Sequence, residues 1–455
     1  MSNFFLVVKL GIGLVGAIAT AYLASSKRLQ QLSDGRFTLA AVTGGAAVRL
    51  AIFVGVFIVA GFAPQSDVMG WYYPQAKEAL LGHVPYRDFA SSYAPLFPYL
   101  ESLALRVWDS PKSIVLLSIL AEIASLPLWL RVARDALGER DARVAMTIYL
   151  CSPLPLVNAA IVGQNQAICS PFLALSLLLA FRGRALLSGL VLGVPLVALK
   201  FLTVLFLPPS FAASSRKTAW IAGAAALPVL VYGALVLAGV DVLTPFRSEA
   251  AVRTSGNLAF LLSAAGHGLS ESTFHPTGGA GRVFIAWLAA GLVLVTLWRV
   301  RFRGTERPDA TLHFTALLLL TFMLLSKKAY SSYLVMAFFP ICVGVVSWAR
   351  TPLARFGFGV VCTIALVEPS LWHTWIAPHD LGVIWNARAA GIPASKLAVF
   401  TLCEVVLVGA YVACWARTLG VLREMPVTGR ALPPLFAPRA EPASAHREGA
   451  VSSKI

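Results

Sequence analysis

Residues 38–62 read TLAAVTGGAAVRLAIFVGVFIVAGF, and the chain continues as APQSD, which ends at Asp67. Arg49 is the one charged side chain in this predominantly apolar run. A helix of about 17 to 25 such residues is long enough to cross the hydrocarbon core of a bilayer. The polar residues that follow therefore mark a point where the chain leaves the membrane.

Runs of the same character recur along the chain, which is 58% hydrophobic and 13% charged over 455 residues. A soluble domain of this size could not bury so much apolar surface. Crossings are predicted at 4–24, 38–62, 113–131, 144–161, 167–181, 219–238, 283–299, 309–325, 333–348, 355–371 and 396–416, with a broken pair within 185–213. We therefore expect an all-α polytopic membrane protein with about 12 to 13 transmembrane helices, in which residues 1–423 form a single transmembrane domain.

Basic residues are distributed unequally between the two sets of connecting loops. One set, together with the C-terminal tail, holds 23 of the 37 Lys and Arg residues, and the opposite set holds 11. The set with 23 basic residues comprises residues 25–37, 131–143, 182–184, 214–218, 299–308, 349–355 and the tail from 417. Because cytoplasmic loops retain basic residues, this distribution predicts that the N-terminus lies outside and the C-terminus in the cytoplasm.

The predicted orientation also bears on two other possibilities, a cleaved signal peptide and a nucleic-acid partner. The first apolar run ends in Ala-Thr-Ala and Ala-Ser-Ser, which resemble signal-peptide cleavage sites, but a signal peptide would place Lys27, Arg28 and Arg36 outside. The net charge of +16 is spread along one membrane side, so it favours contact with anionic lipids and predicts no nucleic-acid partner. The abundance of Ala, Arg and Gly suggests a GC-rich bacterial gene and therefore a bacterial cytoplasmic (inner) membrane, although an endoplasmic reticulum membrane would use the same topology.

Three regions on the predicted outer side are too long or too polar for simple connectors, namely 63–112, 239–282 and 372–395. In the first, residues 70–81 fit a short amphipathic helix lying in the membrane interface. Residues 424–455 are rich in Pro, Ala, Arg and Ser and predict a disordered cytoplasmic tail.

Two charged residues stand at positions where a membrane protein could use them. Asp67 directly follows a predicted crossing, where partial desolvation suits a carboxylate to act as a general base, although a helix cap or a solvated loop acid is also typical there. Lys200 lies within the apolar 185–213 stretch. A cation in such a run faces a cavity or an anionic partner, or else extends to the interface.

The residues after Asp67 form a recognisable pattern. It comprises Tyr72, Ala76, Gly82, Pro85, Tyr86, Asp88, Tyr93 and Pro95. This pattern resembles the first outer loop of the type-C glycosyltransferases, multi-pass enzymes that transfer a sugar from a polyprenyl phosphate on the non-cytoplasmic face. The resemblance implies that Asp67 is the catalytic carboxylate and that Asp88 matches the family's second acidic position.

Later stretches are similar to glycosyltransferase family 87 and related polyprenol-phosphate-mannose-dependent enzymes. Pro153–Asn158 with Val162–Gln166 looks like their second outer turn, in which Gly-Gln marks a hairpin between two crossings. Ser188–Gly193 followed by Lys200 is similar to their Gly-x3-Gly stretch, which ends in a membrane-embedded Lys. Residues 326–333 depart from the family pattern, because Lys327 stands where the family has Pro and no His follows.

The resemblance covers roughly residues 38–350 and implies a reaction. A hexose, with mannose favoured, would pass from a polyprenyl-phosphate donor to a hydroxyl of a glycolipid or glycan acceptor, with inversion. The expected substrate-binding residues are Asp88, Tyr86, Tyr93, Gln164, Asn165, Lys200, Arg253, Lys328, Tyr330 and Tyr333. We expect no cofactor and no metal site, since the His and acidic residues lack metal-ligand spacing.

Amide side chains such as Gln164 and Asn165 suit sugar hydroxyls, but they also suit a polar turn that caps two helices. Lys328 and Tyr330 suit a phosphodiester that protrudes from the lipid layer. Two other classes of protein remain open, a multi-pass lipid or sugar transporter (a flippase, for example) and a non-catalytic scaffold. The enzyme hypothesis requires Asp67, Lys200 and residues 326–333 to converge on one outer cavity, whereas a transporter often carries an inverted repeat.

Overall fold

The computed structural model describes residues 2–252, 254–258, 260–261, 286, 288–296, 307–376 and 392–425. Over these residues the chain consists of helices and short connections, without a β-strand. Eight of the helices are long and apolar enough to cross a membrane. The prediction of an all-α, multi-pass membrane protein is confirmed.

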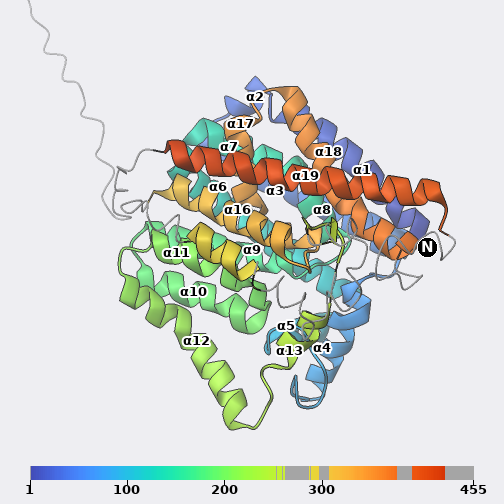
Figure 1. The fold of residues 1–455 in the computed structure, drawn as a ribbon, viewed down its shortest axis with the longest axis vertical. Helices are drawn as coiled ribbons and strands as arrows, with labels where there is room; N and C mark the ends of the chain where they lie inside the picture. The colour runs from blue at the N-terminus through green and yellow to red at the C-terminus, as the bar shows by residue number, and fades with distance from the viewer. Residues whose placement is uncertain are drawn as a thin grey trace, which may run out of the picture.

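The eight candidate spans pack against one another, apart from the span over residues 217–237, which lies at an edge of the molecule against the shorter helix over residues 185–198 (Figure 1). They are α1 (Ser2–Leu23), α3 (Asp34–Phe53) with its π-helical continuation η1 (Val54–Val59), α6 (Pro111–Leu137), α12 (Lys217–Leu237), α16 (Pro308–Leu325), η5 (Ser331–Ala337) with α17 (Phe338–Trp348), α18 (Pro352–Leu371) with η6 (Trp372–Ile376), and α19 (Ala394–Glu424). Each corresponds to one predicted crossing. Helix α19 continues to Glu424, and the described residues end at Met425. The predicted tail, residues 424–455, therefore lies almost entirely outside the described residues.

Shorter helices fill the space between the spans. They are α2 (Lys27–Gln30), η2 (Val68–Tyr72), α4 (Tyr73–Leu80), α5 (Phe97–Val107), α7 (Glu139–Cys151), α8 (Pro153–Ala160), α9 (Gln166–Phe181), α10 (Ala185–Ala198), η3 (Phe201–Phe206), α11 (Leu207–Ala213) and α13 (Thr244–Ala251). The helix expected over residues 70–81 is present as η2 and α4. The crossing expected at 283–299 is described in part, with residues 288–296 helical.

The short helices differ from the sequence-based expectation at two places in the chain. The crossing predicted over 144–161 is two helices, α7 and α8, that meet at Pro153. Proline lacks a backbone N–H and clashes with the preceding turn, so it begins a new helix there. Helix α5 was missed inside the first outer region. Its apolar residues Phe97 and Leu105 are buried, while Leu103 is exposed.

Helices α10 and α12 cross closely because glycine stands at their contact (Figure 1). A Cβ on Gly189 would lie 2.2 Å from the Trp220 carbonyl oxygen, and one on Gly223 would lie 2.1 Å from the Leu186 carbonyl oxygen. Small residues let helix backbones approach in a membrane, where packing drives association. The Gly-x3-Gly stretch therefore has a structural role in this contact.

Helices α1 and α18 pack in the same manner. A Cβ on Gly359 would lie 2.5 Å from the Ala17 Cα atom, and one on Gly13 would lie 2.2 Å from the Thr363 methyl carbon. The chain's first helix is thereby held against a helix more than 300 residues away, so both can contribute to one site.

A buried ion pair joins α3 to α6. The Arg49 Nε donates to a Glu122 carboxylate oxygen at 2.7 Å, and both side chains are 0% exposed. The Tyr149 hydroxyl donates to Glu122 at 3.1 Å, and Arg49 also donates to the Gly45 carbonyl oxygen. The charge in the opening apolar run is therefore paired within the helix bundle, as expected for an ionisable residue in a membrane.

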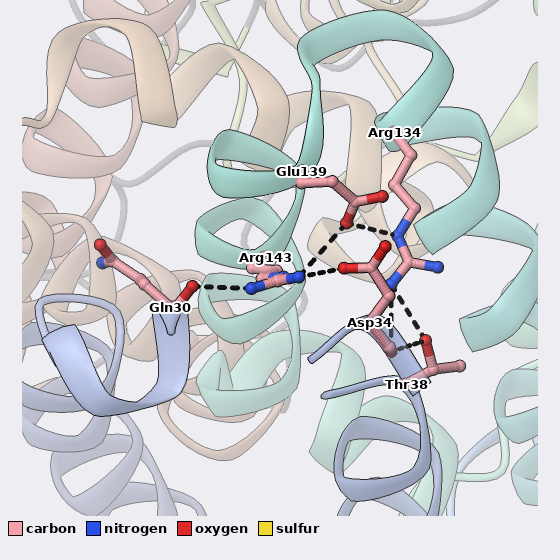
Figure 2. Close-up of polar contacts among 6 residues, drawn as sticks. All are labelled: Gln30, Asp34, Thr38, Arg134, Glu139 and Arg143. Carbon is pink, nitrogen blue, oxygen red and sulfur yellow. Dashed lines mark hydrogen bonds and ion pairs between the residues drawn. The ribbon is translucent and has the colours of Figure 1, made fainter. Parts of the chain in front are cut away.

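At one end of the bundle, polar side chains join the connection between α1 and α3 to the start of α7 (Figure 2). The Arg143 guanidinium donates to the Gln30 carbonyl oxygen at 2.7 Å and forms an ion pair with Asp34. Loops 25–37 and 131–143, both predicted to face the cytoplasm, thus lie together at one side of the molecule.

Candidate active site

A cavity of about 700 Å³ lies among α1, α8, α9, η5 and α18. Its polar lining comes from segments far apart in the sequence, including Asp67, Gln164, Lys200, Lys328 and Tyr330. Such a concave site with a few convergent polar groups is typical of a ligand pocket.

Asp67 lies where η1 has ended and η2 begins. Ser66, immediately before it, has φ of 57°, a left-handed conformation that is uncommon for residues other than glycine. The Gln164 side-chain amide donates to Asp67 Oδ2 at 3.2 Å, and the Tyr72 hydroxyl lies 3.4 Å from the same oxygen. No described residue donates to Oδ1. One carboxylate oxygen is therefore held in place while the other remains available to a ligand.

Gln164 reaches Asp67 because of the glycine that precedes it. Gly163 has φ of 65°, and a Cβ there would lie 2.9 Å from side-chain carbons of both Val68 and Val115. Only glycine fits both the backbone conformation and the space. The turn between α8 and α9 thus presses against η2 and places the Gln164 amide beside the carboxylate.

Lys200 stands at a break between α10 and η3. Its backbone is extended, with φ of −152° and ψ of 134°, five residues after Pro195. Backbone amides of the first outer region satisfy the carbonyls freed by this break, since Leu96 N donates to Val197 O at 2.8 Å and Ala94 N donates to Leu199 O at 3.4 Å. Non-helical backbone at membrane depth is tolerated where it lines a cavity, as it does here.

The segment after α16 forms a tight polar turn. The Ser326 hydroxyl donates to the Lys328 carbonyl oxygen at 2.8 Å and accepts from the Lys328 amide at 3.2 Å. Thr254 holds this turn from the second outer region, because its amide donates to Lys327 O at 3.0 Å and its hydroxyl accepts from Ala329 N at 2.8 Å. The backbone that carries Lys328 is thereby held in place, and Lys328 lines the cavity.

Aromatic rings surround two of the cavity's lysines. Lys200 Nζ lies 4.3 Å from the centre of the Tyr333 ring and 5.8 Å from that of Tyr93. Lys328 Nζ lies 5.7 Å from the centre of the Tyr330 ring, which in turn lies 5.6 Å from that of Tyr333. The two lysines and three tyrosines therefore form one group, which we call the lysine–tyrosine cluster. Cationic and hydroxyl donors placed together in this way suit a phosphate.

Three predicted site residues lie away from the cavity. The Arg87 guanidinium and the Val84 amide bind the Asp88 carboxylate and lower its pKa to about 2, so Asp88 stabilises its own loop. The Tyr86 hydroxyl donates to the Tyr93 carbonyl oxygen and thereby supports a residue of the lysine–tyrosine cluster. Asn165 is fully buried beside Gln164. Arg253, also predicted, lies outside the described residues.

Sequence reasoning did not assign several residues that line the cavity. They are Lys9 on α1, Asn158 on α8, Trp71 on η2, Ser370 at the end of α18 and His373 on η6. Lys9 carried a signal, because it is a charge within an apolar run. Asn158 stands in the stretch that resembles the family's second outer turn, but it was not assigned a role. The other three carried no signal that separates them from ordinary residues near a membrane surface.

Two buried carboxyl groups anchor the loop that carries Thr254. The Ser255 hydroxyl donates to Glu368 on α18, and the Gly256 amide donates to Glu404 on α19 at 2.8 Å. Both acids are almost completely buried. They connect the second outer region to the last two helices. Thr254, which binds the turn bearing Lys328, is thereby held in place.

Comparison with known proteins agrees with this geometry. No curated protein matches the chain. The model of glycosyltransferase family 87 matches residues 93–327, which is just over half of the sequence and includes Tyr93, Gln164 and Lys200. A glycosyltransferase, rather than a transporter or a scaffold, is therefore the class that fits. The chain is a multi-pass membrane protein that belongs to glycosyltransferase family 87.

Proposed function

We propose that this glycosyltransferase moves a hexose, with mannose as the first candidate, from a polyprenyl-phosphate donor to an acceptor hydroxyl on the non-cytoplasmic face. The observation that carries the proposal is the meeting of Asp67 and the lysine–tyrosine cluster in one cavity. A base and a set of cations are what this reaction needs, because a proton leaves the acceptor while negative charge develops on the phosphate.

In the proposed step, Asp67 Oδ1 takes the proton of the acceptor hydroxyl. The acceptor oxygen forms a bond to the anomeric carbon from the side opposite the phosphate, and the bond from that carbon to the phosphate oxygen breaks. The electron pair leaves with the polyprenyl phosphate, so the configuration at the anomeric carbon inverts. Lys200 and Lys328 offset the charge that develops on the leaving phosphate.

The amide and hydroxyl groups near Asp67 fit this assignment. Gln164 and Tyr72 both interact with Oδ2, which orients the carboxylate, and Oδ1 remains for the acceptor. Gln166, Asn158 and Ser332 line the same cavity and offer donors and acceptors to sugar hydroxyls. Hydrogen bonds of this kind can select one hexose over another, because a sugar with a misplaced hydroxyl leaves a buried polar group of the site unpaired.

The donor is tested with purified protein in proteoliposomes that contain a glycolipid extract as acceptor. We expect radiolabel to reach lipid-linked product from polyprenyl-phosphate mannose and not from the nucleotide sugar GDP-mannose. Polyprenyl-phosphate glucose serves as the control for the sugar and should give less product. Equal transfer from the nucleotide sugar would overturn the proposed donor class.

A further inference from the structure

Lys9 is a cation in the first membrane span that is not used by the reaction proposed above. Its Nζ donates to the Ser370 hydroxyl at 2.8 Å, and both residues line the cavity. Within the described part of the chain, no carboxylate lies within 4.0 Å of Nζ. A lysine inside a membrane protein is normally paired with an anion or faces a polar cavity that supplies one. The charge of Lys9 therefore points to a ligand.

The neighbours of Lys9 can also bind an anion. Ser370, His373 and Thr374 line the same wall of the cavity, where α18 continues into η6. They offer two hydroxyl groups and an imidazole beside the ammonium group. The close contacts at Gly13 and Gly359 pack α1 against α18, which brings Lys9 and these three residues to one side of the cavity. Figure 1 shows the two helices together. We call these four residues the Lys9 wall.

The Lys9 wall is separate from the lysine–tyrosine cluster but close to the base. Lys200 and Lys328 contact Tyr93, Tyr330 and Tyr333, whereas Lys9 contacts Ser370 on a different helix. Asp67 lines the same cavity as all four residues of the Lys9 wall. An anion bound at Lys9 would therefore lie near the carboxylate that takes the acceptor proton. Because the proposed reaction assigns Lys200 and Lys328 to the donor phosphate, Lys9 is left for the acceptor.

We propose that the Lys9 wall binds an anionic group, a phosphate or a carboxylate, in the headgroup of a lipid acceptor. This inference rests on the proposed function, because it assigns the acceptor to the side of Asp67. The charges agree with it. Among the described lining residues, three lysines face one aspartate, so the cavity can hold one anionic group on the donor and a second on the acceptor. The Lys9 wall lies outside residues 93–327 that match the family.

Binding is tested without the reaction, by native mass spectrometry of the full chain in dodecyl maltoside with dodecyl phosphate as the probe. We expect two bound probes on the wild type, one on Lys9→Met and two on Lys9→Arg, which keeps the charge. Lys77→Met, an exposed lysine in the first outer region, is the control and should still bind two. Unchanged melting temperatures without the probe show that each variant is folded.

An equal count on Lys9→Met and wild type would overturn the inference. Inorganic phosphate at the same concentration separates a lipid headgroup site from a site for the free ion. Failure of inorganic phosphate to displace the second probe supports the lipid acceptor, and displacement overturns it. Since this count needs no turnover, its result is independent of whether polyprenyl-phosphate mannose proves to be the donor.

A kinetic measurement follows once transfer is established. With a phosphate-bearing lipid acceptor, Lys9→Met should raise the KM for the acceptor by about tenfold or more, because a charge-assisted hydrogen bond is lost. The KM for the donor should change by less than about twofold. A larger increase in the donor KM would place Lys9 at the donor phosphate and contradict the inference.

Discussion

Among single residues, the proposed reaction depends most on the orientation of the Asp67 carboxylate. Two donors interact with Oδ2, the Gln164 amide at 3.2 Å and the Tyr72 hydroxyl at 3.4 Å. The Tyr72 hydroxyl lies at the same distance, 3.4 Å, from Gln164 Oε1, so its single hydrogen can be shared. A carboxylate oriented in this way keeps Oδ1 at the position where the acceptor hydroxyl must bind.

Replacing Gln164 with Leu should lower kcat by about 10- to 100-fold, because a hydrogen bond to a charged group is lost and the carboxylate is less well oriented. The stability of the fold, measured by its melting temperature, should change little. Steady-state kinetics with the lipid donor provide the measurement. A wild-type kcat in this variant would show that Gln164 does not position Asp67.

The sequence predicted some of these residues and not others, for physical reasons. Asp67 and Lys200 are charges at or within apolar runs, where they are costly, so they can be recognised without a structure. His373 and Ser370 reach the cavity only because α18 packs against α1, which no local pattern reveals. Asp88 fits the family pattern in sequence, yet the structure uses it to bind Arg87 and the Val84 amide.

At the scale of helices, breaks and close contacts position the site. The extended backbone at Lys200 separates α10 from η3, and Gly163 sets the turn between α8 and α9. Hydropathy located most crossings, because a long apolar run has few alternatives to a membrane helix. It could not show that 144–161 divides at Pro153, since both halves remain apolar.

The contact between α10 and α12 can be tested with two glycines of the same helix. Gly223→Ala should destabilise the protein by about 1 to 3 kcal/mol, because the added Cβ meets the Leu186 carbonyl oxygen. Gly233→Ala has open space around its Cβ and should leave stability unchanged or slightly increased. Thermal unfolding in detergent measures both. Equal melting temperatures for the two variants would contradict the described helix contact.

At the scale of the whole molecule, the helices separate two polar ends. One end holds the polar contacts among Arg143, Gln30 and Asp34 (Figure 2), and the cavity opens among residues predicted to face outward. Because Lys and Arg concentrate in the first group of loops, the end with Arg143 is expected to lie in the cytoplasm. The site would then meet its lipid substrates at the outer surface.

This orientation can be measured by cysteine labelling in a variant whose six native cysteines are replaced by Ala. Asp109→Cys, in an exposed loop of the first outer region, should react with a membrane-impermeant maleimide in intact cells. Arg140→Cys, exposed at the other end, should react only after the membrane is permeabilised. The reverse result would invert the topology and place the cavity on the cytoplasmic side.

Asp67 is proposed as the base of a lipid-linked sugar transfer, and its replacement by Asn removes that base while keeping the shape of the side chain. Asp109→Asn is the matched control, because this acid of the same outer region is 64% exposed and pairs with Lys77 outside the cavity. We expect Asp67→Asn to retain its fold and lose about 10²- to 10⁴-fold in the rate of transfer from polyprenyl-phosphate mannose in proteoliposomes. Asp109→Asn should transfer at the wild-type rate. A folded Asp67→Asn protein with wild-type transfer would contradict the account.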